Sequence, residues 1–544
     1  MNTRQLQTDK NQKLYHALLG ILLVCALAMM MLLSYWACKY SYYGAVDGRT
    51  RGVLVGDKTW AHIAVFLAAS LCAMGIDKVL MKKDKSQQEK ICLCTLIVTS
   101  VIAFILGVFY VCKNPYYPVG DQINTTAFAA YCRDGNFSML SIGGYVGMYQ
   151  QQKGLAILYE ILFTLFGDFN YRPAKILHVV WWILTILAGY GFLKLNTDRP
   201  VFRMLYCVMM LGCFPLLFYL PYIYGDVLSI SFGIILFYGV AAYEHSGQKR
   251  YIALASFAAG LAVLARKNTW IVLVAVAVYV LLVSLRKKKV RYLMAGTAIL
   301  LTAALSVKAV DVIYEVRSGY PSGVGIPSIL WVAMGLQETE GRAGVYNRYQ
   351  QATFTDYDCQ QELAAQQGKE YIRERLEEFS QDPGMAFNFF KNKVEGQWIE
   401  PMYAALESTE SFEEGAELSP VLESLYYGEL GRTIWKLTNY YQSILYLAGL
   451  MALVMLGILW WKKKEVPISL WLPWIAVFGG FLFSILWEAK SRYVFPYCVF
   501  MILYAPEGLY QTGLLLCKLP KLRKFKKSGH TQDKGEEAPL RETA

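Results

Sequence analysis

The sequence predicts an all-α polytopic membrane protein with about 12 transmembrane helices, an outer juxtamembrane helix and a large outer loop of mainly helical character. Hydrophobic residues make up 56% of the 544 residues and charged residues only 17%, which is too apolar for an ordinary soluble protein. The apolar residues come in runs of about 17 to 23, the length that crosses a bilayer as a helix. The net charge of +12 is carried in short clusters between those runs, a pattern typical of membrane orientation and not of nucleic-acid binding.

Twelve apolar runs along the chain are the predicted spans. One further run, "GLAILYEILFTLFG" at 154–167, is apolar but shorter than a span, and runs of about 10 to 14 residues are more often interfacial or re-entrant. We expect that segment to be a helix lying flat on the outer surface. The twelve runs lie near 14–36, 59–80, 91–112, 174–194, 201–221, 227–243, 250–265, 269–285, 292–311, 441–461, 467–487 and 492–508.

Positive charge predicts the orientation of these spans. If 154–167 lies flat, all basic clusters fall on one side of the membrane, whereas a spanning helix there would move every later cluster to the other side. We therefore expect both termini in the cytoplasm and a multi-pass protein in a bacterial plasma membrane, with the endoplasmic reticulum as the alternative. The clusters are Arg4, Lys10 and Lys13; Lys82, Lys83, Lys85 and Lys90; Lys249 and Arg250; 286–289; 462–464; and the tail "KLPKLRKFKK".

The expected topology divides the chain into five parts. The acidic run "ESTESFEEGAE" in the outer loop predicts solvated surface. The 12 cysteines and five histidines are scattered, so neither a zinc site nor a disulfide framework is predicted. The parts are two N-terminal spans (1–90), a membrane module (91–311), the large extracytoplasmic loop (312–440), the C-terminal spans (441–510) and a basic, disordered cytoplasmic tail (511–544).

Two isolated acids stand at the outer ends of predicted spans. Asp121 lies in "NPYYPVGDQINTTAFAAY" and Asp226 in "YIYGD", each beside Gly and Tyr. A charge at membrane depth is costly and often functional. Asp is also a favoured N-cap residue, so helix capping is the alternative for both. The neighbouring tyrosines Tyr116, Tyr117, Tyr222 and Tyr224 fit an interfacial aromatic belt.

Cations stand in two short outer hairpins, Arg266 and Lys267 in one and Lys490 and Arg492 in the other. Arg can donate two hydrogen bonds to a phosphate, although snorkelling to lipid headgroups needs no function. Cations on a lipid-linked phosphate and carboxylates on an acceptor would together favour sugar transfer, because negative charge grows on the phosphate and positive charge on the sugar ring. A divalent ion held by either acid would share the phosphate charge.

The order of these features resembles the GT-C membrane glycosyltransferases, especially the branch of protein O-mannosyltransferases and lipid A aminoarabinose transferases. "VGDQINTTAFA" is similar to the acidic motif in the first outer loop of that family, and "YQQQKGLAILYEILFTLFGDFNYRPAKIL" to its juxtamembrane helix. "YLPYIYGDVLSI" is similar to its second acidic position, and "EAKSRYVFPYCVFMILYAPEGL" to its final helix. The resemblance covers about 91–310 and 465–510, and gives no motif for 312–440.

The resemblance implies roles for individual residues. Asp121 would be the catalytic carboxylate and Asp226 a second acid near the acceptor, and the two would be the ligands of any metal ion. The sequence departs from the family at Gln152 and Gln122, where relatives have acids, which puts the metal in doubt. The implied contacts to the donor phosphate are Lys153, Arg266, Lys267 and Arg492.

Residues and resemblance together predict an integral membrane glycosyltransferase that moves a sugar from a polyprenyl-phosphate donor to an extracytoplasmic glycan, lipid or protein. Its expected partners are that donor, that acceptor and membrane lipids. One alternative is a transporter or flippase of lipid-linked glycans, which predicts charged residues along a path inside the spans. Another is a non-catalytic membrane scaffold whose loop 312–440 binds a partner, which gives no reason for Asp121, Lys153 and Asp226 to converge. In that loop, Trp398 and Glu400 of "QWIEP" are suggested acceptor-site residues.

Overall fold

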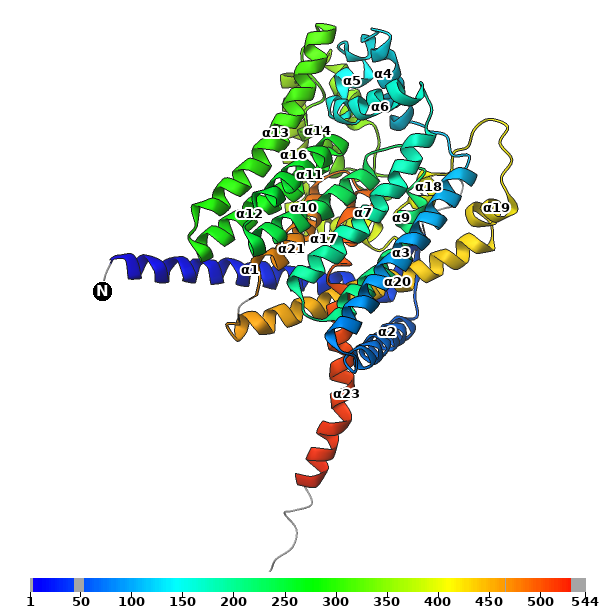
Figure 1. Cartoon of the computed structure of the whole chain (residues 1–544). Coiled ribbons are helices and arrows are strands. Elements are labelled where there is room, and N and C mark those ends of the chain that lie inside the picture. Colours follow the sequence, from blue (N-terminus) through cyan, green and yellow to red (C-terminus); the bar gives the residue numbers. More distant parts are fainter. Residues whose placement is uncertain (1–2, 44–52, 465, 530–544) are drawn as a thin grey trace, which may run out of the picture.

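The computed structural model describes residues 3–43, 53–464 and 466–529. Within these ranges the chain is mostly helical, with two small antiparallel sheets, β1 (Tyr40–Tyr43) with β2 (Val53–Gly56) and β3 (Glu338–Thr339) with β4 (Arg342–Ala343). The main helices form one bundle, and α23 projects from it (Figure 1). These main helices are α1 (Thr3–Lys39), α2 (Thr59–Leu80), α3 (Lys85–Lys113), α7 (Arg172–Asn196), α10 (Asp226–Ser246), α11 (Lys249–Ala265), α12 (Trp270–Lys287), α13 (Val290–Ser318), α20 (Glu429–Trp461), α21 (Leu472–Leu486) and α23 (Ala505–Gly529).

Shorter helices connect the long ones and build the segment after α13. They are α4 (Asp121–Arg133), α5 (Tyr145–Met148), α6 (Lys153–Phe166), α8 (Pro200–Gly212), α9 (Phe214–Phe218), α14 (Ile329–Gly335), α15 (Tyr349–Asp356), α16 (Gln361–Gln381), α17 (Pro383–Trp398), α18 (Ala405–Ser408), α19 (Pro420–Tyr427) and α22 (Ser491–Met501), with 3-10 turns η1 (Ser138–Leu140), η2 (Gln150–Gln152), η3 (Lys267–Thr269) and η4 (Ile468–Trp471).

In the described ranges, nine helices are long and apolar enough to cross a membrane. Their outward faces are apolar, as lipid contact requires. In α3, for example, Ile97, Val101, Ile105 and Phe109 recur every fourth residue and are each about half exposed, whereas Ala103 on the other face is fully buried. The chain is therefore an all-α, multi-pass membrane protein. The nine helices belong to α1, α2, α3, α7, α10, α12, α13, α20 and α21.

The other three predicted spans are shorter or broken helices. The run predicted near 201–221 is divided between α8 and α9 at Cys213, just before Pro215 in the first turn of α9. The last run is divided between α22 and α23, and Pro496 lies inside α22. The helix α11 is continuous but has only 17 residues. Proline removes a backbone donor and bends or ends a helix. The two breaks come just before Pro215 in the first turn of α9 and just before Pro506 in the first turn of α23.

The segment predicted to lie flat is α6, and it is amphipathic. Leu155, Tyr159 and Phe163 are buried on one face, while Ile161 and Leu165 on the other are 54% and 67% exposed. An apolar face without protein contacts suits a helix at a membrane surface. In Figure 1 α6 lies with α4 and α5 at the top of the molecule, away from the turn between α12 and α13.

The C-terminal end of α13 holds this small unit in place. The helix continues seven residues beyond the predicted span limit at 311 to Ser318. There Arg317 pairs with Glu160 of α6 at 2.6 Å and donates to the Cys132 carbonyl of α4, and Tyr314 donates to the same carboxylate at 3.2 Å. These contacts attach α4 and α6 to the bundle.

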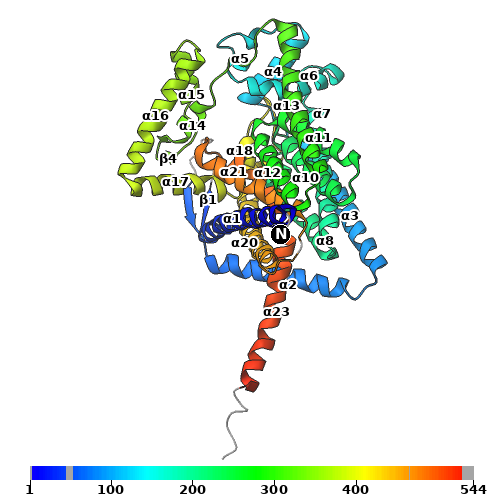
Figure 2. The same cartoon turned by 90° about the vertical axis from the view of Figure 1, so that its left-hand side faces the viewer.

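The segment 312–440 folds into α14–α19 with the β3–β4 pair. Figure 2 shows α14 to α17 as a lobe beside the bundle, with β1 next to α17. The Tyr42 amide of β1 donates to the Ile399 carbonyl after α17 at 3.0 Å, so the lobe also contacts the hairpin between the first two spans. The helix α23 continues to Gly529, where a disordered tail was predicted from 511, and the predicted tail at 530–544 lies outside the described residues.

Candidate functional site

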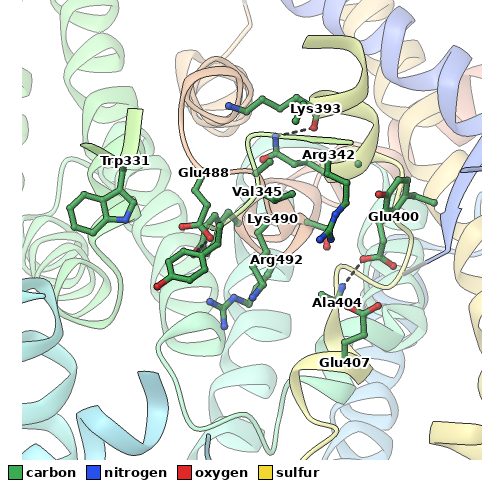
Figure 3. Close-up of a pocket in the computed structure, with 18 of the residues that line it drawn as sticks. Trp331, Arg342, Val345, Lys393, Glu400, Ala404, Glu407, Glu488, Lys490 and Arg492 are labelled. Carbon is green, nitrogen blue, oxygen red and sulfur yellow. Dashed lines mark hydrogen bonds between the residues drawn. The ribbon is translucent and has the colours of Figure 1, made fainter. Parts of the chain in front are cut away.

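A cavity of about 1250 Å³ opens at one end of the bundle. Its wall combines the start of α4, the turn between α21 and α22, the α14–α17 lobe and the β1–β2 hairpin. Charged side chains of both signs and several aromatic rings line it (Figure 3). Small-molecule sites are typically about 300–1,000 Å³, so the cavity is larger than a typical site for one small ligand.

Asp121 lines this cavity at the N-terminus of α4. The N-cap residue is Gly120 and Asp121 makes no capping hydrogen bond, so the capping alternative does not account for its side chain. Its Oδ1 accepts instead from the Tyr145 hydroxyl at 2.8 Å. Burial and the nearby Asp121 charge raise the pKa of the Tyr145 phenol, which keeps it a donor. The positive end of the helix dipole also favours a carboxylate there.

Arg492 lines the same cavity from the first turn of α22. It is only 5% exposed, and its Nε has no hydrogen-bond partner in the described part of the chain. Its guanidinium lies over the rings of Tyr222, Tyr224 and Tyr493 at 5.2, 5.4 and 5.5 Å. Cation–π contacts offset part of the cost of burial, but no carboxylate lies within ion-pair distance among the described residues. A buried cation without an anion favours an anionic ligand.

Asp226 does not line the cavity. It begins α10 without capping it, is 2% exposed, and pairs through Oδ2 with Arg266 Nη1 at 3.1 Å. The Arg266 guanidinium lies over Tyr224 at 5.1 Å and Tyr493 at 5.5 Å, and both of those rings line the cavity. The pair therefore stands directly behind the cavity wall and supports it.

Two of the predicted phosphate contacts are engaged elsewhere. Lys153 is 3% exposed and pairs with Asp311 of α13, while also donating to Ser322 Oγ at 2.8 Å. Lys267 is exposed and donates to Ser328 Oγ at 3.4 Å. Neither lines the cavity, although Gln152, next to Lys153, does and donates to the Tyr224 hydroxyl.

The predicted tyrosine belt is also placed differently. Tyr116, Tyr222 and Tyr224 are all less than 10% exposed, so these rings pack inside the protein and do not face the interface. The sequence cannot separate the two placements, because a tyrosine after an apolar run suits an interface or a wet protein interior equally.

Three acids that line the cavity, Glu400, Glu407 and Glu488, were not predicted as catalytic residues. Glu488 lies in the turn between α21 and α22, and burial raises its pKa to about 7, with Asp121 adding to the shift and Lys490 opposing it. Glu400 follows α17 and Glu407 lies in α18, and burial raises the pKa of both carboxyls, with the Glu400 charge raising that of Glu407 further. Glu407 was predicted as solvated surface. Of the two suggested acceptor residues, Glu400 lines the cavity.

Trp398, the other suggested acceptor residue, is fully buried, and its Nε1 donates to Ser484 Oγ at 3.0 Å. It is a core residue. The aromatic residue that lines the cavity from the lobe is Trp331 of α14, which stacks on Trp487 with centroids 5.9 Å apart. Tyr149 meets the Trp331 ring edge-on.

The described residues offer no ligand set for the predicted divalent ion. No group of three or more His, Cys, Asp or Glu side chains in the described ranges is arranged to hold a metal ion. The two predicted ligands are separately engaged, Asp226 by Arg266 and Asp121 by Tyr145. The described residues at these two positions therefore do not fit the ion.

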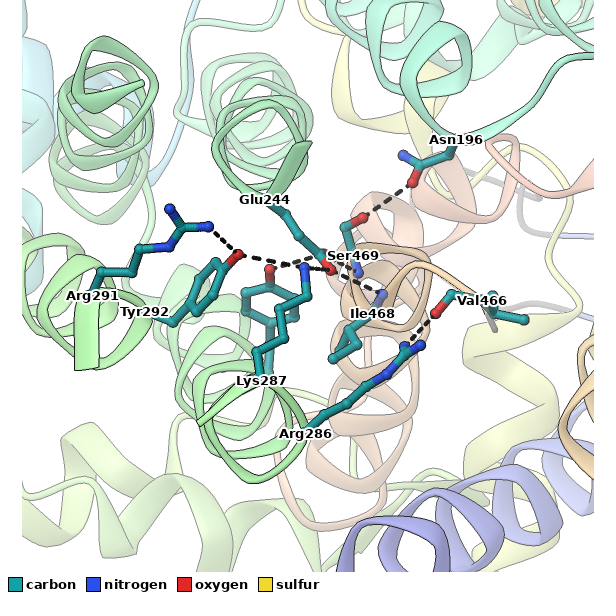
Figure 4. A network of polar contacts seen from close by, with 10 residues as sticks. Asn196, Glu244, Arg286, Lys287, Arg291, Tyr292, Val466, Ile468 and Ser469 are labelled. Carbon is teal, nitrogen blue, oxygen red and sulfur yellow. Dashed lines mark hydrogen bonds and ion pairs between the residues drawn. The ribbon is translucent and has the colours of Figure 1, made fainter. Parts of the chain in front are cut away.

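Buried charge at the opposite end of the bundle is paired. Glu244, near the end of α10, accepts from Lys287 at 2.8 Å, Tyr279 at 3.0 Å and the Ser469 amide at 2.8 Å (Figure 4). Eighteen residues separate Glu244 from Asp226, which is about 27 Å along a helix and close to the thickness of a bilayer core. The basic run at 286–289 lies at the Glu244 end.

Comparison of the chain with models of known protein families, with curated proteins and with solved structures finds no match.

Proposed function

We propose that this protein is an integral membrane glycosyltransferase that moves a hexose or pentose from a polyprenyl-phosphate donor to an extracytoplasmic acceptor of the cell envelope. The observation that carries the proposal is one cavity lined by both Asp121, a carboxylate at a helix N-terminus, and Arg492, a buried cation with no carboxylate partner among the described residues. The resemblance to GT-C glycosyltransferases supports it through the same two residues.

The topology we propose completes the nine long helices with three shorter crossings, α8–α9, α11 and α22–α23, to give about 12 spans. It places both termini in the cytoplasm and the cavity outside. Support comes from the helix ends: the cavity lies where α3 and α21 end and α10 begins, and the basic clusters lie at their other ends. Lys and Arg are enriched in cytoplasmic loops, so this arrangement fits a plasma membrane protein.

In the proposed reaction an acceptor hydroxyl attacks the anomeric carbon of the donor sugar. The bond between that carbon and the phosphate oxygen breaks, and the phosphate departs with the electron pair. Arg492 binds the phosphate oxygens, where negative charge grows. Asp121 accepts the hydroxyl proton, with Tyr145 fixing the orientation of the carboxylate. General-base catalysis of this kind contributes about 10²- to 10⁴-fold.

The placement of buried charge favours an enzyme over a transporter of lipid-linked glycans. Asp226 and Glu244 occupy the two ends of α10, and each is paired with a cation. A transport path would need polar groups along the middle of the spans.

The test is transfer of radiolabelled sugar from polyprenyl-phosphate donors in membranes with matched expression. We expect Asp121→Asn to lower the rate about 10²- to 10⁴-fold, because Asn keeps the size but cannot take the proton. The control is Asp134→Asn at the exposed C-terminal end of the same helix, which should transfer at the wild-type rate. Equal rates for wild type and Asp121→Asn would refute the catalytic role.

A further inference from the structure

The wall that the lobe contributes to the cavity is rich in hydrogen-bond acceptors. Glu400 is 4% exposed, and its two carboxylate oxygens accept from the Met402 and Ala404 amides at 2.8 and 2.6 Å. Glu407 lies close enough to Glu400 for the charge of one to raise the pKa of the other. Figure 3 shows both carboxyl groups on one side of the cavity and Arg492 on the other.

Neither carboxylate has a cationic partner. No Lys, Arg or His nitrogen in the described part of the chain lies within ion-pair distance of Glu400 or Glu407. The charge of Lys490 opposes the rise in the pKa of Glu407, but Lys490 makes no ion pair with it among the described residues. Two neighbouring carboxylates without a counter-ion repel each other, so the site gains from a cation.

A second, independent observation also indicates a ligand that donates. Gln397, one turn before Glu400, lines the cavity and is 1% exposed, and its Oε1 has no donor among the described residues. Gln350 Oε1 and Glu395 Oε1, which belong to the same wall, also lack donors. Buried polar atoms are nearly always paired, so these three acceptors in the residues of the lobe wall, together with its two carboxylates, favour a ligand that donates hydrogen bonds.

We propose that Glu400, Glu407 and Gln397 form an acceptor subsite for an oligosaccharide that carries free primary amines. An ammonium group supplies a positive charge and three donors, which is what this wall lacks, and sugar hydroxyls supply further donors. Trp331 and Tyr42 line the same cavity and offer aromatic faces to the sugar rings. That the bound glycan is an acceptor rests on the proposed sugar transfer. The subsite would hold the amine-bearing glycan opposite the anion bound at Arg492.

The subsite is tested by binding without donor, so that no transfer is needed. The probes are the tetramer of β-1,4-linked glucosamine and its fully N-acetylated counterpart, which share ring number and linkage and differ in charge. Binding to detergent-purified protein is followed by tryptophan fluorescence. We expect saturable binding of the amine tetramer and at least tenfold weaker binding of the acetylated one. Loss of a charged hydrogen bond typically weakens binding about tenfold to a hundredfold, and we expect this for Glu407→Gln.

Glu407 is the residue to change because its carboxylate makes no hydrogen bond with the described residues, so its loss does not disturb the fold as that of Glu400 would. The control is Glu340→Gln. Glu340 lines the cavity on the β3–β4 turn, where it lies 3.6 Å from Arg342, and the substitution removes the same charge at a different place. It should change the affinity less than twofold.

Three results would overturn the subsite: equal binding of the two tetramers, unchanged binding by Glu407→Gln, or no saturable binding. Failure of the transfer reaction is a separate outcome. If the amine tetramer binds with the expected charge dependence but no donor sugar is transferred to any acceptor, the subsite stands and the glycosyltransferase proposal fails. If Asp121-dependent transfer to another acceptor occurs without tetramer binding, only the subsite fails.

Discussion

Replacing Arg266 with Met removes the cation from the buried pair behind the cavity wall. The side chains of Asp226 and Arg266 are only 3% and 12% exposed, and their charged atoms lie 3.1 Å apart. Removing one member of a buried pair leaves an uncompensated charge and costs about 3–5 kcal/mol, whereas replacing both with apolar residues is often close to neutral. Arg266 also loses its contacts with two tyrosine rings, worth about 0.5–2 kcal/mol each.

We therefore expect Arg266→Met and Asp226→Leu each to lower the free energy of unfolding by about 3–5 kcal/mol. The double variant should lose clearly less than the sum, with a coupling of about 3 kcal/mol. Unfolding in detergent micelles, followed by circular dichroism, measures the four forms of this double-mutant cycle. Sugar transfer is measured on the same preparations.

The result that contradicts this reasoning is a pair of single variants as stable as the wild type. The activity of the double variant distinguishes a structural role of the pair from a catalytic role of Asp226. If the double variant recovers stability and transfer together, the pair only positions Tyr224 and the wall. If it recovers stability but stays inactive, Asp226 takes part in the reaction, as the resemblance implies.

Two further predictions concern the same region. Burial raises the pKa of Glu488 in the folded protein to about 7, from a usual value near 4.5. Its contribution to stability is therefore complete below about pH 4.5 and is lost as the pH rises through 7. Glu488→Gln should flatten this fall in stability, and an unchanged pH profile of unfolding would contradict the prediction. Gly225→Ala should destabilise the protein and slow transfer, because a Cβ there would lie 2.0 Å from the Ala265 carbonyl oxygen, although a φ of −83° suits any residue. The control Gly75→Ala, with open space around it, should be neutral in the unfolding assay. Equal effects of the two substitutions would refute the steric argument.

The sequence was sufficient for the fold class because one property, apolar length, decides whether a helix crosses a membrane. The nine long helices all fall on predicted spans. The number of spans is harder to predict. The run at 201–221 is mostly apolar, but its interruption at Cys213 and Pro215 depends on backbone geometry, which a hydropathy window does not measure.

The candidate site was predictable only where a charge followed an apolar run. Asp121 and Arg492 were found in that way, and both line the cavity. Glu400, Glu407 and Trp331 were not singled out in this way, because they lie in a lobe whose polar helices lack a membrane signal. Their position depends on how α14, α17 and α18 fold against the bundle, which is a matter of contacts between residues far apart in the sequence.

Among the acids near the membrane, the partner of the carboxylate and not its position in the sequence separates structural from chemical roles. Placing a charge near the membrane is costly, and for Asp226, Glu244 and Glu160 that cost is offset by Arg266, Lys287 and Arg317. Each of those cations is distant in sequence from its acid, so no local motif predicts the ion pair. Asp121 differs: among the described residues its partner is the Tyr145 hydroxyl and not a cation, and its side chain lines an open cavity. A carboxylate held in this way can take a proton from a ligand without first breaking an ion pair.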